Sequence, residues 1–182
     1  MTRKEEAYDY IRSEIVHNHF HPNEVVSENQ ITDKLNMSRT PVREALKQLE
    51  ADGLIEMRGR ENVVAPLTVD AVQEVYELRS LLETFALKKT INLVPIVRLN
   101  EIEEDFERAA AKNDWDEYLN VDTEFHELIT HIAGHPRLAQ FLNILKAQTA
   151  RTRHVSSLNP YRMNRSLEEH KEIIKWLRQR NL

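Results

Sequence analysis

Apolar residues recur at helical spacing in the first part of the chain and divide it into three short segments. Residues 4–17, 27–35 and 39–52 each place apolar side chains three or four positions apart, which is the spacing of one face of an amphipathic helix. Pro41 stands in the first turn of the third segment, where its missing N–H removes no helical hydrogen bond. The pattern therefore predicts three helices in this part of the chain.

Residues that favour helix caps mark the ends of the second and third helices. Ser27 with Gln30 can form a capping box at the start of the second, and Asn36 can adopt the left-handed backbone conformation that ends it. Ser38 can cap the third helix, and Gly53 stops it. Two short helices joined by a tight turn, with a helix in front, predict a helix-turn-helix.

A short β-hairpin is predicted directly after the third helix. The basic sequence Arg58-Gly59-Arg60 is preceded by the apolar residues Leu54, Ile55 and Met57 and followed by Val63 and Val64. Two apolar stretches separated by a turn that contains glycine are typical of a hairpin. We therefore expect the helix-turn-helix to carry a wing with a basic tip.

The rest of the chain is helical in pattern and shows no strand or repeat signal. Amphipathic spacing recurs at 68–92, 95–111, 114–133, 136–156 and 166–182. The stripe predicted to be buried in the first of these comprises Val72, Val75, Leu78, Leu82, Phe85 and Ala86. Ser166 with Glu169 makes a second potential capping box, at the start of the last segment. We expect a mainly α protein, with a winged helix-turn-helix domain at 1–66 and an antiparallel all-helical bundle domain at 67–182.

Composition narrows the class of protein and the chemistry available to it. A length of 182 residues with 41% hydrophobic residues accommodates two compact domains. No apolar run approaches the roughly 20 residues that span a bilayer, and the charged N-terminus lacks the apolar segment of a secretory signal. We therefore expect a cytoplasmic protein with no membrane partner. The chain has no cysteine, so any metal would be held by histidine and carboxylate side chains.

Positive charge is concentrated on the third helix, although the chain as a whole has a net charge of −5. Arg39, Arg43 and Lys47 follow one another at intervals of four residues, so they form one basic ridge opposite the apolar face. In a helix that enters the major groove, arginine can read a guanine edge, while lysine and hydroxyl groups contact phosphates. The alternative is an ordinary solvated helix face. The basic hairpin and the order of the elements favour DNA binding.

The third helix also carries a specific resemblance. Residues 38–46 read SRTPVREAL, followed by Leu49-Glu50 and by the sequence GLI at 53–55. This run resembles the recognition-helix signature of the GntR family of transcription regulators. The resemblance implies that Arg39 and Arg43 contact bases and that the wing contacts the neighbouring groove. The DNA-binding residues expected from the ridge, the signature and the wing are Ser38, Arg39, Thr40, Arg43, Lys47, Arg58, Gly59 and Arg60.

Asparagine replaces glycine at four positions where members of this family usually have glycine. The four positions are Asn18, Asn23, Asn36 and Asn62. Asparagine tolerates a positive φ better than other residues with a side chain. We therefore expect the same backbone conformation at all four positions.

Two residues of the second domain have the spacing of metal ligands. Asp122 and His126 lie four apart on one predicted helix, so both side chains leave the same face, and His170 lies in the first turn predicted for the last helix. A single D-x-x-x-H pattern is weakly specific. Taken alone, it is more often a buried polar pair than a metal site.

The order of elements around these residues resembles the FCD type of helical effector domain, found in the FadR subfamily. In that domain an Asp and three His hold a divalent metal beneath a small-molecule cavity, and Asp122, His126 and His170 match three of the four ligands. The fourth has no counterpart, so the chain is shortened at its C-terminus or the site is completed by water, effector or another residue such as His154. Arg79 and Glu83 also fit that domain.

The resemblance and the residues together predict a regulator and not an enzyme. We expect a homodimer on a palindromic double-stranded DNA operator, controlled by a small carboxylate or sugar acid, with zinc, nickel or manganese as the metal. Arg79, Arg151 and Arg153 are candidates to bind the effector, although an exposed helix face explains the last two equally well. The alternatives are a metal-dependent hydrolase built on the three ligands, and a DNA-binding dimer that senses nothing.

Overall fold

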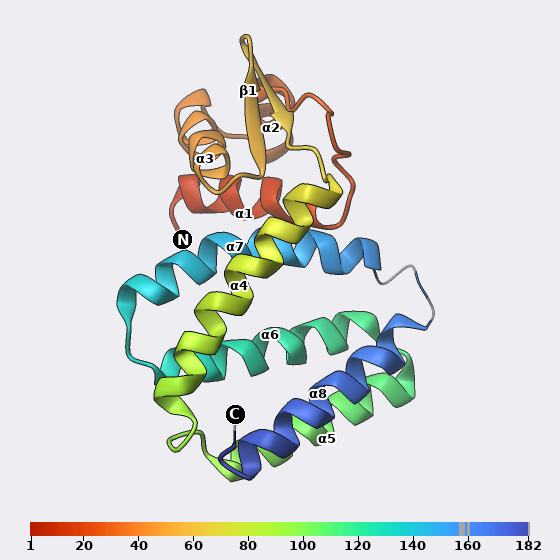
Figure 1. Ribbon diagram of the computed structural model, residues 1–182. Helices are drawn as coiled ribbons and strands as arrows, with labels where there is room; N and C mark the ends of the chain where they lie inside the picture. Colours follow the sequence, from red (N-terminus) through yellow and green to blue (C-terminus); the bar gives the residue numbers. More distant parts are fainter. Residues whose placement is uncertain (157–158, 160, 182) are drawn as a thin grey trace. The chain divides into compact units, whose positions relative to one another are not determined.

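The structure is a computed structural model that describes residues 1–156, 159 and 161–181. It divides into two compact units, Met1–Tyr76 with Asn143–His154 and Glu77–Leu142 with Val155–Leu182. Helices and one two-stranded hairpin make up the regular structure of the described residues (Figure 1). The mainly helical class with a winged helix-turn-helix is therefore confirmed.

Three helices form the core of the first unit, and their bounds lie within a residue of those predicted. They are α1 (Arg3–Val16), α2 (Glu28–Leu35) and α3 (Arg39–Ala51), and both α1 and α2 pack against α3. Each turns one apolar face inward, and the residues shielded from water include Ala7, Ile11, Ile15, Ile31, Val42, Ala45, Leu46 and Leu49. Burial of these faces fixes the orientation of α3, so that its opposite face lies in solvent.

The hairpin that follows α3 is the predicted wing. Strands β1 (Ile55–Arg58) and β2 (Glu61–Val64) pair antiparallel, with Ile55 opposite Val64 and Arg58 opposite Glu61. Gly59 at the tip has a φ of 66°, a conformation that costs little only in glycine. The first two residues after β1, Gly59 and Arg60, form the exposed turn.

Three of the four asparagines that replace glycine adopt the expected backbone conformation. The φ angles are 59° at Asn18, 67° at Asn23 and 47° at Asn36. The prediction for Asn62 was wrong, because that residue lies inside β2 and pairs with Met57 in extended conformation. The turn needs its positive φ at Gly59, so nothing forces one at position 62.

Both capping boxes predicted from the sequence were wrong. Ser27 occupies the N-cap of α2 but makes no side-chain cap hydrogen bond. Ser166 lies one turn inside the last helix, which begins at Arg162, and its buried hydroxyl faces a histidine instead of a helix end. Ser38 stands at the N-cap of α3, also without a side-chain cap bond, which leaves its hydroxyl in solvent.

A segment from much later in the chain belongs to the first unit. Residues 143–154 of helix α7 (Pro136–Ser156) contribute Ala147 to its hydrophobic core. Gln148 donates a hydrogen bond from Nε2 to the backbone oxygen of Asp52, at 3.0 Å. The side chain of Gln148 thereby satisfies a carbonyl at the C-terminal end of the recognition helix.

The second unit is a helical bundle. It is formed by α5 (Ile96–Lys112), α6 (Trp115–Ile132), α8 (Arg162–Arg178) and parts of α4 (Val69–Thr90) and of α7. Helix α5 packs against both α6 and α8. Phe106, Tyr118 and Phe125 are the largest side chains enclosed in its core. Among the described residues, no helix is long and apolar enough to cross a membrane.

The buried stripe predicted for helix α4 was wrong at two of its six positions. Val75 and Ala86 are buried and Val72 and Leu82 are partly buried, but Leu78 and Phe85 are exposed. Apolar residues occupy most of the circumference of this helix, so periodicity alone does not decide which face is covered. The last helix differs as well, because α8 runs from Arg162 to Arg178 instead of over 166–182, and position 182 lies outside the described residues.

Candidate metal centre and DNA-binding surface

The exposed face of α3 carries the predicted basic ridge. Arg39, Arg43 and Lys47 are all exposed, and Thr40 lies beside them at the start of the helix. The buried face of the same helix holds Val42, Ala45, Leu46 and Leu49. The basic side chains therefore project from a helix whose orientation is fixed by its own core.

Two basic groups of this surface are held by neighbouring carboxylates. Arg43 donates from Nε to Oε2 of Glu28, at 2.8 Å, and Arg58 donates from Nη2 to Oε2 of Glu56, at 3.0 Å. Arg43, Arg58 and Glu56 are exposed and Glu28 is partly exposed, and ion pairs at the surface contribute about 0–1 kcal/mol. A phosphate or a base edge can replace these carboxylates at low cost.

The C-terminal end of α3 is fixed by a buried carboxylate. Asp52 accepts hydrogen bonds from the hydroxyl of Tyr8, at 2.7 Å, and from Nε2 of Gln48, at 3.2 Å. Burial and the bond to Asp52 raise the pKa of Tyr8 well above its ordinary value, so the phenol keeps its proton and donates a hydrogen bond to Asp52 at neutral pH. The bond ties α1 to the end of the recognition helix.

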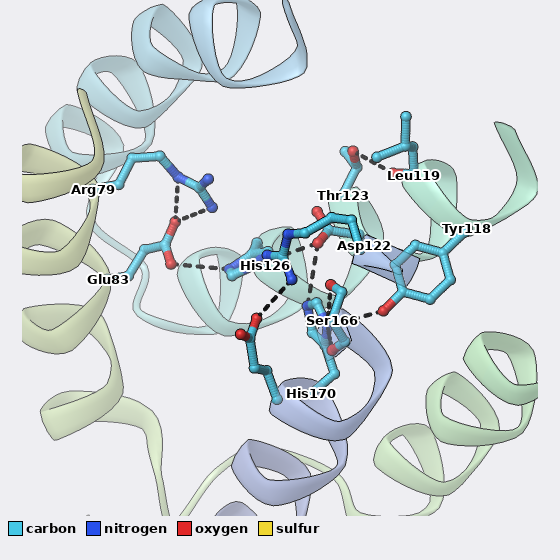
Figure 2. A network of polar contacts seen from close by, with 11 residues as sticks. Arg79, Glu83, Tyr118, Leu119, Asp122, Thr123, His126, Ser166 and His170 are labelled. Atoms are coloured by element: carbon cyan, nitrogen blue, oxygen red, sulfur yellow. Dashed lines mark hydrogen bonds and ion pairs between the residues drawn. The ribbon is translucent and has the colours of Figure 1, made fainter. Parts of the chain in front are cut away.

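The three predicted metal ligands come together in the second unit. Asp122 and His126 project from α6 and His170 projects from α8, and one ligand atom from each lies within 4.8 Å of the others. Figure 2 shows both imidazoles turned toward Asp122. The distance to Asp122 Oδ1 is 3.2 Å from His170 Nε2 and 4.0 Å from His126 Nε2. Among the described residues the group has no fourth member.

The second nitrogen of each imidazole is held by an acceptor outside this group. His126 Nδ1 lies 2.9 Å from Oε2 of Glu83, and His170 Nδ1 lies 2.7 Å from the backbone oxygen of Ser166. Carboxylates and carbonyls only accept, so in the neutral rings Nδ1 carries the proton and Nε2 keeps its lone pair. Both rings therefore present a metal-ligating nitrogen to the side on which Asp122 lies.

Burial makes a cation favourable at this group. Asp122 is 5% exposed and His170 is 6% exposed, and the His170 ring packs against Phe106 in a tilted arrangement, with 4.4 Å between ring centroids. The same burial raises the pKa of the neighbouring Tyr118 to about 12. A carboxylate removed from water needs a positive partner. One carboxylate and two imidazoles are the ligand types that zinc and similar divalent ions bind, so the residues fit such an ion.

The Glu83 carboxylate is held by Arg79, one turn earlier on the same helix. Oε1 accepts hydrogen bonds from Arg79, at 2.9 Å from Nε, and lies 2.7 Å from Nη2 (Figure 2). Burial raises the pKa of Glu83, but the bonds and charges of His126 and Arg79 outweigh it, so the pKa lies below its ordinary value. Glu83 is therefore an anion that uses both carboxylate oxygens. Arg79 reaches the metal group through Glu83.

The other two arginines predicted to bind an effector differ in their surroundings. Arg151 is 4% exposed, and its Nη2 is buried without a hydrogen-bond partner among the described residues. That burial lowers the pKa of its guanidinium. Arg153, two residues further along α7, is only partly buried. The alternative of an exposed helix face is thus excluded for Arg151, and its role in binding an effector stays a prediction.

Sequence reasoning missed the residues that orient the imidazoles. The resemblance placed Arg79 and Glu83 in the FCD domain but predicted no contact between the Glu83 carboxylate and His126. The sequence pattern predicted that Ser166 caps a helix, not that its backbone oxygen holds His170. The available signal was the spacing of four between Arg79 and Glu83 on an otherwise apolar stretch of helix. A charged pair at that spacing on a half-buried helix indicates a polar partner on another element.

Two protein-family models match this chain, and several known regulators are similar to it. The model of the bacterial regulatory proteins of the gntR family matches residues 3–64, and the FCD domain model matches residues 74–182. The gluconate operon transcriptional repressor of Bacillus subtilis is 35% identical over 143 residues, 77% of this chain, and this chain covers 58% of its length. The transcriptional repressor RspR of Escherichia coli is 26% identical over 181 residues, which is 97% of this chain and 79% of that protein.

A solved structure shows the same fold. McbR/YncC of Escherichia coli superposes with a TM-score of 0.81 at 20% identity, over 99% of this chain and 88% of that one. At this level of identity the likeness concerns the fold alone. The two family matches, by contrast, lie on the helices and the wing described above and on the bundle that carries Asp122, His126 and His170. The chain belongs to the GntR family, in the subfamily with a C-terminal FCD domain, and is a DNA-binding transcription regulator and not an enzyme.

Proposed function

We propose that this regulator binds a palindromic operator as a homodimer in the cytoplasm, and that a small carboxylate bound at a divalent metal ion controls its affinity for DNA. Residues 1–66 would bind DNA, and residues 67–182 would bind the effector and form the dimer. The observation that carries the proposal is the buried group of Asp122, His126 and His170, in which both imidazoles are oriented by acceptors outside the group.

The surface of α3 and the wing supports operator binding. Exposed basic residues line one face of α3, and the hairpin tip adds Arg58 and Arg60. In a dimer two such helices can enter successive major grooves, so a palindromic site follows from the symmetry of the protein. Arg39 and Arg43 would read base edges, while Ser38, Thr40 and Lys47 would contact the backbone.

The metal group supports a carboxylate as effector. A zinc, nickel or manganese ion held by Asp122, His126 and His170 would supply a Lewis-acidic partner for an anionic oxygen. Three protein ligands leave a coordination position for such an oxygen or for water. The gluconate repressor of Bacillus subtilis is named for the operon of a sugar acid, and gluconate carries the kind of group that this centre would bind.

Arg151 is a second candidate contact for the effector. Its guanidinium is buried with Nη2 lacking a hydrogen-bond partner among the described residues. A buried donor without a partner costs about 1–3 kcal/mol, which an anionic ligand would recover through charge-assisted hydrogen bonds. Arg79, in contrast, is engaged by Glu83 and would act on the ligand only indirectly.

A two-stage titration tests the metal and the effector separately. Metal-stripped protein is titrated with zinc in a calorimeter, and the zinc-loaded protein is then titrated with gluconate, lactate and citrate. We expect one zinc site per chain with a Kd below about 1 μM, and carboxylate binding that disappears when zinc is removed. Binding of zinc without binding of any carboxylate would refute the effector assignment.

A further inference from the structure

Glu83 joins the metal group to helix α4 through its contact with His126 (Figure 2). Its Oε2 lies 2.9 Å from His126 Nδ1, while Oε1 is held by Arg79 one turn earlier on the same helix. The side chain is half-buried, and each carboxylate oxygen has a defined partner. The orientation of Glu83 is therefore fixed before any ion binds.

A carboxylate at this position selects one tautomer of His126. It can only accept, so it stabilises the proton on Nδ1 and leaves the lone pair on Nε2. A glutamine at position 83 would offer both an acceptor and a donor. When its NH₂ group faces Nδ1, the proton moves to Nε2, and that nitrogen can no longer bind a cation.

We propose that Glu83 is a positioning residue for the metal centre and that it connects occupancy of the centre to helix α4. This inference rests on the proposed function, because it concerns the same Asp122, His126 and His170 group. A histidine that ligates a cation becomes a stronger N–H donor, so loading the centre strengthens the bond to Glu83 and holds α4 more firmly against α6.

Helix α4 is placed to carry such an effect. Ala86 and Leu82 pack it into the core of the second unit next to Glu83. Its first residue, Val69, follows strand β2 of the wing after four residues, and its N-terminal part is counted with the first unit. One helix thus contains both the partner of a metal ligand and the direct chain connection to the DNA-binding domain.

The first test measures zinc affinity by calorimetry in E83Q and in a matched control. Glu74→Gln makes the same change on the same helix, at an exposed position. Loss of an outer hydrogen-bond partner typically weakens metal binding 10- to 100-fold, and we expect a loss of that size in E83Q with no change in the control. Equal zinc affinity in E83Q and the wild type would overturn the positioning role.

The second test reads the proposed connection by hydrogen exchange. In the wild type, zinc should slow amide exchange in residues 80–90 of α4 as well as in α6 and α8. In E83Q at saturating zinc, the protection of 80–90 should be lost and that of α6 and α8 kept. Equal protection of 80–90 in both proteins would overturn the connection to α4.

A measurement on the zinc-free wild type covers the case in which E83Q does not fold. Long-range ¹H–¹⁵N spectra report which ring nitrogen of His126 carries the proton. Protonation on Nδ1 is the expected result, and a neutral ring protonated on Nε2 would contradict the role of Glu83. A wild-type chain that binds no zinc at all would instead overturn the metal assignment itself, and this outcome is visible without any variant.

Discussion

The DNA-binding surface and the metal group differ in how much of their geometry exists before a partner arrives. On α3 and the wing the basic side chains lie in solvent, and Arg43 and Arg58 pair with carboxylates at the surface. In the metal group the side chains are buried or half-buried, and both imidazoles are fixed by acceptors. The packing of α3 fixes which way its basic side chains project, but their conformations are set only when DNA binds. The metal group is arranged by the protein itself.

The difference predicts that the largest single effect comes from removing a metal ligand. His126→Ala should weaken zinc binding by more than about 100-fold, the upper limit for losing an outer partner only, because one of three ligands is gone. Calorimetric titration of the metal-stripped variant measures the effect. His131→Ala provides the control, since it removes an exposed histidine from the same helix, and zinc affinity that falls equally in both variants would contradict the assignment.

Removing one side chain from the DNA-binding surface should weaken operator binding less than removing a metal ligand weakens zinc binding. Arg43→Ala should cost roughly 1–3 kcal/mol of operator binding and relax specificity at one base position. Fluorescence anisotropy with a selected operator and single-base variants of it gives both quantities. Arg165→Ala, an exposed arginine on α8, serves as the control. Equal loss on every sequence would show that Arg43 contacts only phosphate.

Two glycines allow the two domains to be compared at matched positions. Gly59 in the wing and Gly134 after α6 have φ angles of 66° and 63°, and an added Cβ would meet no atom within 4 Å at either. Each change to alanine should therefore destabilise its domain through backbone strain alone, by about 1–2 kcal/mol. Thermal denaturation measures this loss, and operator affinity should fall in Gly59→Ala only. Unchanged DNA binding in Gly59→Ala would exclude the wing tip from the interface.

The smallest effect is expected from the carboxylate that holds Arg43. Glu28→Gln removes an exposed ion pair worth about 0–1 kcal/mol and lowers the negative charge beside the recognition helix, so operator affinity should rise severalfold at low salt and less at high salt. Anisotropy titrations at two salt concentrations measure both effects. Glu6→Gln, which breaks the Arg3–Glu6 pair on α1, should change neither value, and weaker DNA binding in Glu28→Gln would show that this glutamate itself contacts the operator.

Local rules predicted most of the fold, because helix ends and turns depend on few residues. The apolar stripes of α1 and α3 are flanked by charged positions, so their buried faces could be identified directly. The positive φ predicted at Asn62 was wrong because this hairpin turn needs a positive φ at only one residue, and that residue is Gly59. The burial predicted for Leu78 and Phe85 was wrong because α4 has apolar residues around most of its circumference, so the pattern does not identify one buried face.

For the candidate site, spacing and resemblance identified the ligands but not their surroundings. Asp122 and His126 share a face of α6 by helical geometry, and the FCD resemblance added His170. Glu83 approaches His126 from a different helix, 43 positions earlier in the sequence (126 − 83). No local pattern encodes a contact of that kind, since it depends on how α4 and α6 pack. The burial of Arg151 escaped prediction for the same reason.

Control of DNA binding by the metal centre is tested by measuring operator affinity with and without zinc and a carboxylate. Metal-stripped protein is titrated onto a selected operator alone, with zinc, and with zinc plus the carboxylate that binds most tightly. We expect zinc plus carboxylate to change the Kd for DNA by about 5- to 150-fold, the range of a coupling free energy of ~1–3 kcal/mol, and His126→Ala to abolish the change. An operator affinity that is identical in all three states would show that the second domain only dimerises the protein and senses nothing.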